Sequence, residues 1–419
     1  MMMIVASQAS EPSLLATPNP KRVTVQAQPL TSPLMQHLLP LVEANAPAVA
    51  VRLQAVGEPQ PRRHERFKYV DVRRLLATPA LPVRQLEDSA HWNHGLLQPM
   101  NRPCVPANGV ETMDDPFALL ALGLSTTPLE LRLPNHGEPL HPIELTCNLN
   151  EEAIYPIALQ ADLQAGSQAT VWVNLQQSTL TNNTLVLGLV DANLAEGSQL
   201  TVIVTGNVQA NTHVYFTTQG DVHATAQLTV ISLGLQAGTF RHSMQANLLG
   251  EGADAQCNGL LLANEAMQGH HHIQINHRVP NCTSGQLFKT IATDTAKCEF
   301  DGSIYVAPHA IETDAQQLSN TLLLSNKAKV YNRPWLQIDA DDVKCSHGAT
   351  VGQLDAQQLF YLKSRGIDET TATALLMHAF AYQVLESLAS AVPEVHAQVQ
   401  PWVEDRLSQF FCVKDGCGA

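Results

Sequence analysis

The sequence predicts a mainly β protein, in which a β-solenoid (β-helix) core is flanked by N-terminal and C-terminal α-helical regions. Two observations predict this fold. From about residue 143, the chain runs in short segments rich in Val, Leu, Thr and Gln, with the period-two alternation typical of strands. Within this stretch, similar segments recur about every 30 residues, which indicates a coil that returns and stacks on itself.

The repeat is visible in the sequence itself. "GSQATVWV" at residues 166–173 recurs as "GSQLTVIV" at 197–204, and "QLTVI" at 199–203 recurs at 227–231. Each interval also contains a further strand-like segment, so one repeat holds at least two short strands. A β-propeller is the main competing fold, but a propeller blade needs roughly 40 residues or more. We therefore expect a solenoid.

The first hundred or so residues are expected to form helices joined by proline-rich connectors. Ser32 and Pro33 have the character of an N-cap and a first helical residue, and an interruption or kink is expected at Pro40. A second amphipathic helix is expected in the basic run from Pro61 to Leu76.

From about residue 353 the apolar pattern becomes helical again. Asp355 and Asp368 are expected to cap two successive helices, and Pro393 is expected to end the second. A last amphipathic turn or helix is expected at residues 402–411. The second helix carries a predicted apolar stripe: Ala372, Leu375, Leu376, Phe380, Val384 and Leu388.

These changes of period divide the chain into three parts. A chain of 419 residues is long enough for two or three domains. We expect an N-terminal helical region at residues 1–125, a β-helix core at 126–352 and a C-terminal helical domain at 353–419.

Composition and charge argue against several classes of function. Acidic residues outnumber basic ones by 38 to 24, and the one dense basic run is interleaved with carboxylates, which argues against a nucleic-acid surface. Nowhere do about 18 apolar residues follow one another, so no membrane helix is expected. The N-terminal "MMMIVA" lacks the features of a secretory signal, and the eight scattered cysteines form no C-x-x-C motif. We therefore expect a cytoplasmic protein.

The sequence contains no motif of a familiar enzyme class. There is no phosphate-binding G-x-x-x-x-G-K-[ST], no G-x-S-x-G and no H-E-x-x-H. A carbohydrate-cleaving β-helix enzyme commonly uses clustered carboxylates, whereas those of the expected core are dispersed apart from "DADD" at residues 339–342. We therefore expect a noncatalytic protein.

Three consecutive histidines, His270 to His272, are candidate metal ligands. On a strand only His270 and His272 share a face. We interpret the run as exposed or edge histidines in a β turn. The alternative is a self-associating β-helix module that binds a transition metal through this His-rich strand, although the spacing fixes no third ligand.

Cys345 and His347 are separated by a single residue. On a regular strand they share one face, with Cβ atoms roughly 7 Å apart. This separation is awkward for one tetrahedral ion but suits two ligands presented across an interface. From spacing alone, a pair that is half-buried in the stack is the simpler interpretation.

The motifs from His277 onward carry a resemblance to a known family. "HRVPNCTSGQLFK" at residues 277–289 is followed in order by "DGSIYV", "TDAQQLSNTLLLS" and "ADDVKCSHGATVGQLDAQQLFYLKSRGI". In these segments the chain resembles the SufB/SufD family of iron–sulfur cluster assembly scaffolds, and the last segment is most similar to the SufD branch. Residues 65–75 and 115–124 resemble N-terminal landmarks of that branch.

The resemblance implies a right-handed parallel β-helix that pairs with a SufB-like subunit. It implies that helices from Asp355 to about Leu388 dock a SufC-like ABC ATPase, and it leaves open a homodimer of the isolated chain. His347 matches a histidine implicated at the SufB–SufD interface, where a nascent cluster is built, and Cys345 matches its neighbouring cysteine. A transient iron–sulfur cluster or iron is thus expected at that interface, with no cofactor or metal in the isolated chain. Cys298 has no assigned role.

Overall fold

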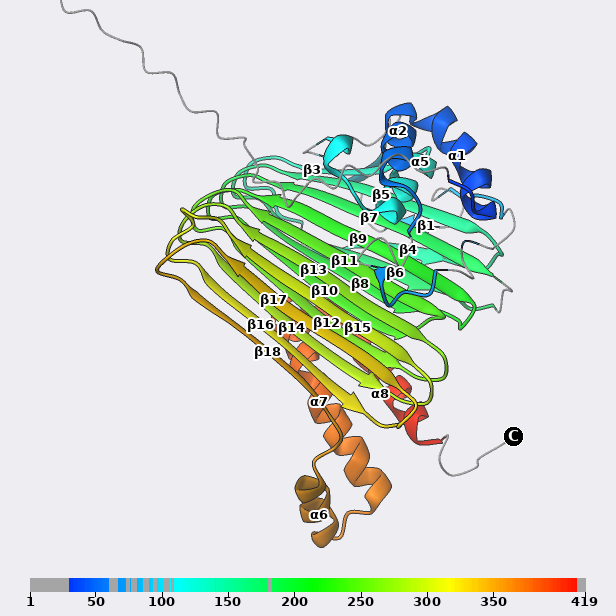
Figure 1. The fold of residues 1–419 in the computed structure, drawn as a ribbon, viewed down its shortest axis with the longest axis vertical. Coiled ribbons are helices and arrows are strands. Elements are labelled where there is room, and N and C mark those ends of the chain that lie inside the picture. The colour runs from blue at the N-terminus through cyan, green and yellow to red at the C-terminus, as the bar shows by residue number, and fades with distance from the viewer. Residues whose placement is uncertain are drawn as a thin grey trace, which may run out of the picture.

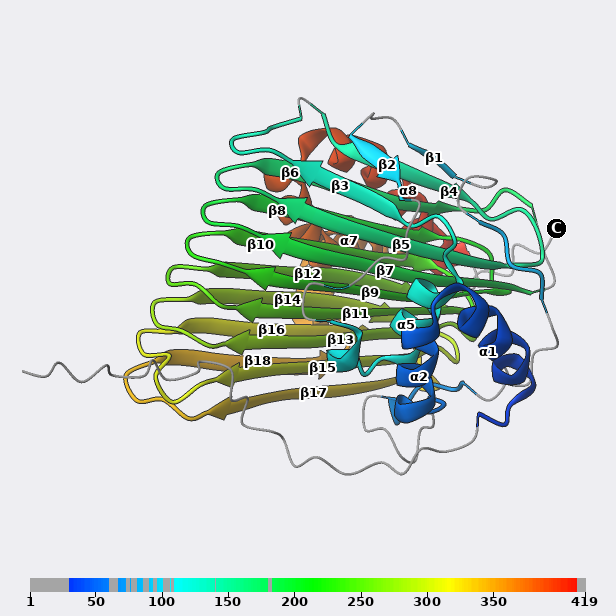
Figure 2. The ribbon, with the colours of Figure 1, turned by 90° about the horizontal axis from the view of Figure 1, so that it is seen from above.

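Two facing sheets form the core of the protein. The computed structural model of the chain describes residues 30–59, 67–72, 76, 81–85, 90–92, 96–100, 106, 109–139, 141–179 and 183–412. Within these residues, the strands form two nine-stranded sheets, here named sheet I and sheet II. The two sheets face each other, and the strands of each follow one another along a common axis (Figures 1 and 2).

Sheet I contains, in spatial order, β1 (Ala90–Trp92), β4 (Ile143–Asn148), β6 (Gln168–Gln176), β8 (Gln199–Asn207), β10 (Gln227–Gln236), β12 (Asp254–Ala263), β14 (Thr283–Ala292), β16 (Asp314–Leu323) and β18 (Lys344–Gly352). Sheet II contains β2 (Leu97–Pro99), β3 (Leu129–Leu133), β5 (Ile154–Leu163), β7 (Thr184–Leu194), β9 (Thr212–Val222), β11 (Thr239–Leu248), β13 (Gln268–His277), β15 (Lys297–Val306) and β17 (Lys329–Ile338).

From β4 onward, consecutive strands alternate between the two sheets, so each coil of the chain adds one strand to each sheet. Neighbouring strands of a sheet are parallel, except for the antiparallel pairs β1–β4 and β2–β3. This connectivity is that of a parallel β-solenoid. The predicted mainly β fold is therefore confirmed, and the competing propeller is wrong.

The sequence repeat corresponds to strands that lie directly on one another. Gln168 of β6 pairs with Gln199 of β8, which pairs with Gln227 of β10, so the repeated segments are stacked in register. Gly166 and Gly197, which open two of the repeats, have φ angles of 66° and 67°. Residues other than glycine adopt this left-handed conformation less readily, which accounts for the glycine at both corners.

The interior of the solenoid is filled by alternate residues of both sheets. Val171, Val202 and Val230 occupy the same interior position on β6, β8 and β10, and all three are fully buried. Their neighbours Trp172, Ile203 and Ile231 point outward and belong to a second buried cluster beneath the C-terminal helices. Both faces of sheet I are therefore apolar over much of their length, as is typical of a parallel sheet covered on its outer face.

The N-terminal helices cover the outer face of sheet II. These elements are α1 (Pro33–Asn45), α2 (Pro47–Val56), η2 (Val110–Thr112) and α5 (Pro116–Leu124). The apolar α5 packs against β5, β7 and β9. Ser32 caps α1 by accepting a hydrogen bond from the backbone N–H of Met35 at 3.4 Å, which confirms the predicted cap. Pro40 lies within α1, which continues past it to Asn45.

Two of the three C-terminal helices, α7 (Glu369–Ala391) and α8 (Pro393–Cys412), cover the outer face of sheet I. The third is α6 (Ala356–Ser364). Asp355 caps α6 through the N–H of Gln357, and Asp368 caps α7 through the N–H of Thr371, so both predicted caps are confirmed. Figure 1 shows that α8 and the C-terminal half of α7 lie along the sheet, whereas α6 projects away from it.

Two predictions for these helices need correction. Leu375 belongs to the predicted apolar stripe but is 47% exposed, whereas Ala372 and Met377 on either side of it in α7 are fully buried, so Leu375 lies outside the face of the helix that packs. The predicted end of the second helix at Pro393 is confirmed, since α7 ends at Ala391. Pro393 is itself the first residue of α8, so the separate helix predicted at residues 402–411 is the second half of a longer helix. Among the described residues, no helix is both long and apolar enough to cross a membrane.

The N-terminal region also differs from its prediction. Of the basic run at residues 61–76, only 67–72 and 76 are described, and 67–72 form a turn and an extended segment instead of an amphipathic helix. The short strands β1 and β2 lie where helices and proline-rich connectors were predicted, and each pairs with an early strand of the solenoid. The division into domains at residues 125/126 and 352/353 stays a prediction.

Candidate functional site at the open end of the solenoid

The C-terminal end of the solenoid is open. β18 is the last strand of sheet I and β17 is the last strand of sheet II, and no described residue pairs with their outer edges. Trp335 on β17 and Val351 on β18 are each 49% exposed. Unpaired strand edges are ready templates for another chain, and exposed apolar side chains beside them favour such a contact. This end of the solenoid is therefore a candidate docking surface.

Cys345 and His347, the two site residues predicted from the sequence, lie on β18. In register with β16, Cys345 pairs with Ala315 and His347 pairs with Gln317, without a shift between them. Paired residues of a parallel sheet share a face. Cys345 is half-buried against the interior cluster around Ile304, whereas His347 is exposed. The structure therefore places both residues at the rim of the solenoid interior, on the open end.

The environment of Cys345 favours its neutral thiol. Partial burial raises the pKa of Cys345, the negative charge of Asp314 raises it further, and a hydrogen bond with the backbone of Ala315 opposes both effects. Because the thiolate is the form that binds metals, Cys345 becomes a ligand only when something else stabilises its negative charge.

Polar side chains line the interior next to this rim. Gln317 on β16 donates a hydrogen bond from Nε2 to Oε1 of Gln286 on β14, at 2.7 Å. Gln317 Oε1, Gln286 Nε2 and both amide atoms of Asn332 on β17 are buried, and within the described chain they have no hydrogen-bond partner. These interior amides were not predicted from the sequence, because glutamine in an alternating strand ordinarily indicates the solvent face.

The three consecutive histidines lie in the middle of β13, so the prediction of exposed or edge histidines in a turn is wrong. His270 Nδ1 is hydrogen-bonded to Glu299 Oε2 at 3.1 Å, and His272 Nδ1 is hydrogen-bonded to Asp301 Oδ2 at 3.2 Å. These two histidines share the outer face of sheet II, as predicted, whereas His271 points into the interior.

The acidic partners of His270 and His272 on the outer face of sheet II are also paired with an arginine. Arg333 on β17 lies 2.6 Å from Asp301 Oδ2 and 3.3 Å from Glu299 Oε1. Burial acts to raise the pKa of Asp301, but the hydrogen bond from His272 and the charges of His272 and Arg333 outweigh it and lower the pKa. In the described part of the chain, no three His, Cys, Asp or Glu side chains are arranged to hold a metal ion. The arrangement gives no support to the alternative of a metal-binding module.

His271 takes part in a buried chain of hydrogen bonds that crosses the interior. His271 Nε2 lies 3.0 Å from Ser232 Oγ, which lies 3.0 Å from His242 Nδ1, and His242 Nε2 lies 2.9 Å from Thr218 Oγ1. Burial lowers the pKa of His271 to about 3, and it holds the pKa of His242 well below the usual value. Both rings are therefore neutral at pH 7 and serve as polar cross-links between the two sheets.

The motif "HRVPNCTSGQLFK" is explained by structural contacts. His277 Nε2 is hydrogen-bonded to Ser284 Oγ at 2.9 Å, which joins the end of β13 to the start of β14. Lys289 Nζ donates to Asn320 Oδ1 at 2.9 Å and lies 4.7 Å from the centre of the Phe380 ring on α7. The motif therefore fixes a corner of the solenoid and one contact of α7 with sheet I.

Most of the other described cysteines are deeply buried. Burial raises the pKa of Cys147, Cys257 and Cys298 to about 12 in each case. Cys298, which had no assigned role, lies within the apolar interior cluster. Thiols in such surroundings are unreactive.

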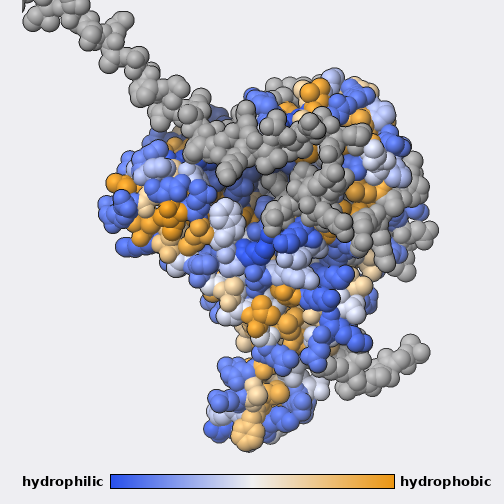
Figure 3. Space-filling model, viewed as in Figure 1, coloured by the Kyte–Doolittle hydropathy of each residue, from blue (hydrophilic) through white to orange (hydrophobic). Residues whose placement is uncertain are grey.

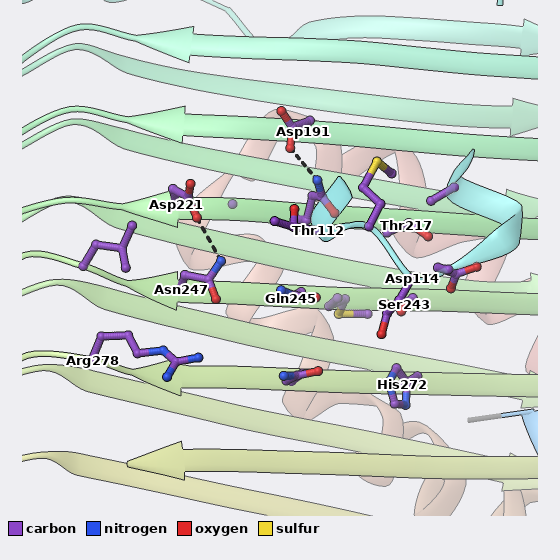
Figure 4. A pocket seen from close by; sticks show the side chains of 18 residues that line it. Thr112, Asp114, Asp191, Thr217, Asp221, Ser243, Gln245, Asn247, His272 and Arg278 are labelled. Carbon is purple, nitrogen blue, oxygen red and sulfur yellow. Dashed lines mark hydrogen bonds between the residues drawn. The ribbon is translucent and has the colours of Figure 1, made fainter. Parts of the chain in front are cut away.

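A cavity of about 400 Å³ lies on the outer face of sheet II, beside η2 and the start of α5 (Figure 4). Its polar side chains bind one another across neighbouring strands: Gln219 donates to Asp191 at 2.6 Å and Asn247 donates to Asp221 at 2.9 Å. Its described lining includes no residue of β18. The cavity is therefore separate from the rim that carries Cys345 and His347.

Comparison with known proteins identifies the family. The model of the "SUF system FeS cluster assembly, SufBD core domain" matches residues 153–380, which is more than half of the chain. The chain belongs to the SufBD family. Its SufBD core runs from the residue before β5 into α7, so it includes β18 with Cys345 and His347, and it includes α6.

Individual members of the SufBD family are similar to parts of the chain. "Iron-sulfur cluster assembly protein SufD" of Escherichia coli is 36% identical over 46% of this chain and 53% of its own length. A SufBD family protein of Synechocystis, slr0076, is 39% identical over 39% of this chain and 36% of its own length. "Protein ABCI7, chloroplastic" of Arabidopsis thaliana is 35% identical over 42% of this chain and 37% of its own length. The matches thus span about half or less of these curated relatives.

Proposed function

We propose that the chain is a noncatalytic scaffold subunit for iron–sulfur cluster assembly, and that it pairs with a SufB-like subunit through the open end of its solenoid. The observation that carries this proposal is the unprotected edge of β17 and β18 next to Cys345 and His347. A second solenoid has strands of the same spacing, so docking at this edge continues both sheets and buries Trp335 and Val351.

The nascent cluster is the substrate of this assembly, and we place it between the two subunits. Imidazole nitrogen and thiolate sulfur are both ligands of iron. His347 and Cys345 share the face of β18 at the rim, so together they supply one half of a site that the partner completes. Since burial favours the neutral thiol of Cys345, His347 is the primary ligand on this chain.

The projecting helices are the proposed docking site of a SufC-like ATPase. Phe360 and Tyr361 on α6 are 73% and 56% exposed, and Leu375 and Tyr382 on α7 are also exposed. Figure 3 shows hydrophobic residues at the surface of these helices, away from the sheets. Exposed aromatic side chains on a protruding element are typical anchors of a protein interface. A docked ATPase supplies the nucleotide hydrolysis for which this sequence has no motif.

We propose that the same open edge lets the chain associate with a second copy of itself in the absence of its partner. Two copies that meet at β17 and β18 bury the same exposed side chains that a SufB-like subunit buries. We therefore propose a homodimer of the isolated chain that is displaced by the SufB-like subunit.

The cytoplasmic location stays a prediction.

Co-purification tests the pairing. Replacement of Trp335 and Val351 by Lys puts two charges on the edge, and we expect the variant to lose the SufB-like subunit while it retains the SufC-like ATPase. Val51 on α2 is 68% exposed and does not lie on β17 or β18, so Val51→Lys is the matched control. If the double variant still elutes with the SufB-like subunit under mild salt, docking through the open end is wrong.

A further inference from the structure

We propose that Gln317 positions His347: its buried side-chain carbonyl accepts a hydrogen bond from one ring nitrogen, which leaves the other nitrogen free to bind iron. This inference rests on the proposed function and adds a residue to the same site. Gln317 itself contacts neither iron nor the cluster, so its role is to hold the ring of His347 in one orientation and one tautomer.

The amides of Gln286 and Gln317 form a ladder that runs along the solenoid axis toward His347. The three residues occupy successive register positions on β14, β16 and β18. Because Gln317 Nε2 is directed back toward Gln286, its Oε1 is the free end of the ladder on the side of β18. Adjacent strands lie about 4.8 Å apart, which is the spacing at which stacked amides bond from one strand to the next.

Gln317 Oε1 is an unsatisfied acceptor at a buried position. Gln317 is 3% exposed, and its Oε1 has no hydrogen-bond partner in the described chain. Buried polar atoms are nearly always paired. His347 is the next residue in the same column and carries an N–H on its ring, so a rotation of its side chain toward the interior supplies the missing donor.

The ladder is in contact with the opposite sheet. Gly302 on β15 faces it from the opposite sheet, and a Cβ atom at this position would overlap Gln317 Nε2 and lie 2.9 Å from Gln286 Oε1. The two amides therefore reach across the whole interior and touch the backbone of sheet II. This contact restrains the two amides from moving toward sheet II, which helps them to orient the residue at the end of the ladder.

The chemistry of the pair matches the way proteins prepare histidine ligands. A metal-binding histidine ordinarily donates its other ring N–H to a carbonyl or carboxylate oxygen, which fixes the tautomer and the ring orientation. An amide carbonyl does this without placing a negative charge in the interior. Gln317 supplies such an oxygen on the side of His347 that faces away from the partner subunit.

The tautomer of His347 tests the proposal in the full-length chain without partner or metal. Long-range ¹H–¹⁵N spectra of ¹⁵N-histidine-labelled protein report which ring nitrogen carries the proton, and loss of signals in His347→Asn assigns them. We expect one dominant tautomer in the wild type. We expect Gln317→Met, which removes the acceptor, to shift the ratio several-fold toward that of free imidazole. Gln316→Met is the matched control, because Gln316 is exposed on the other face of the same strand.

A conservative variant guards against a folding defect, and a second measurement separates this proposal from the function on which it rests. Gln317→Glu keeps an acceptor toward His347, so we expect it to retain the wild-type tautomer if the Met variant unfolds. An unchanged tautomer ratio in a folded Gln317→Met protein overturns the proposal, whatever the yield of clusters in the complex. If the ratio shifts, but both Gln317→Met and His347→Ala assemble clusters normally, the hydrogen bond exists and the assembly role of both residues is wrong.

Discussion

Gln317 and His347 are register partners on adjacent strands of one sheet, yet Gln317 is buried and His347 is exposed. The pair marks the point where a polar layer of the solenoid interior reaches the open end. The long amides of this layer reach the opposite sheet and meet its backbone at Gly302.

Gly302→Ala should therefore destabilise the protein by about 1–3 kcal/mol, because the added methyl group forces the Gln286–Gln317 ladder out of place. Urea unfolding measures the effect. Gly352→Ala is the matched control, since a Cβ at Gly352 has no atom within 4 Å. Equal stabilities of the two variants would show that the interior has room for the methyl group.

Arg241 and Asp115 form a buried ion pair at 2.9 Å between β11 and the N-cap of α5. Arg241→Met leaves the carboxylate buried without this partner, so we expect a loss of about 3–5 kcal/mol in the free energy of unfolding. Arg132→Met removes an ion pair with Glu130 on the surface and should cost less than about 1 kcal/mol. A small effect at Arg241 would show that this pair contributes little to holding α5 on sheet II.

The buried histidines predict a loss of stability in acid. Burial lowers the pKa of His271 to about 3 and that of His277 to about 4, from an ordinary value of 6.5. The unfolded chain therefore takes up protons below about pH 6.5 while the folded chain does not, and this protonation favours the unfolded chain. The free energy of unfolding therefore decreases as the pH falls from about 6.5 toward 4. Urea midpoints across this range should fall less steeply in His271→Gln than in the wild type. Parallel curves would show that His271 is not held neutral.

The exposed aromatic residues of α6 predict a binding defect without a folding defect. Phe360→Ser should weaken binding of a SufC-like ATPase by at least about 10-fold, because it removes a large anchor side chain. The free energy of unfolding should change by less than about 0.5 kcal/mol, since Phe360 makes few contacts within the chain. Calorimetric titration with the ATPase measures the affinity, and Gln357→Ala on the same helix is the control. Unchanged affinity in Phe360→Ser would place the ATPase elsewhere.

The features of the fold that the sequence predicts are those written in local patterns. The repeats at residues 166–173 and 197–204 are stacked strands, and Ser32, Asp355 and Asp368 cap helices as expected. Leu375 shows the limit of such patterns. Its helical spacing fits an apolar stripe, but the buried face of α7 runs through Ala372, Met377 and Ala381, and the tertiary arrangement decides which face of the helix packs.

The candidate site was only partly predictable. Alternation along a strand predicts that His270 and His272 share a face, but it does not say which face is interior, so the buried environment of His271 was missed. Gln286 and Gln317 are 31 residues apart, and their contact follows only from the register of the solenoid. The open end is likewise invisible in sequence, because exposed and covered edge strands have similar patterns.

The most direct test of the account is the cluster content of the assembled complex with and without His347. The complex of the chain with its SufB-like and SufC-like partners is co-expressed, purified without oxygen, and compared by its iron–sulfur absorption and its iron content. Ser346→Ala is the control, because Ser346 lies on β18 between Cys345 and His347 and is exposed on the opposite face. The account predicts that His347→Ala forms an intact complex with little or no cluster, while Ser346→Ala matches the wild type. A normal cluster content in His347→Ala would contradict the assignment of the open end as the assembly site.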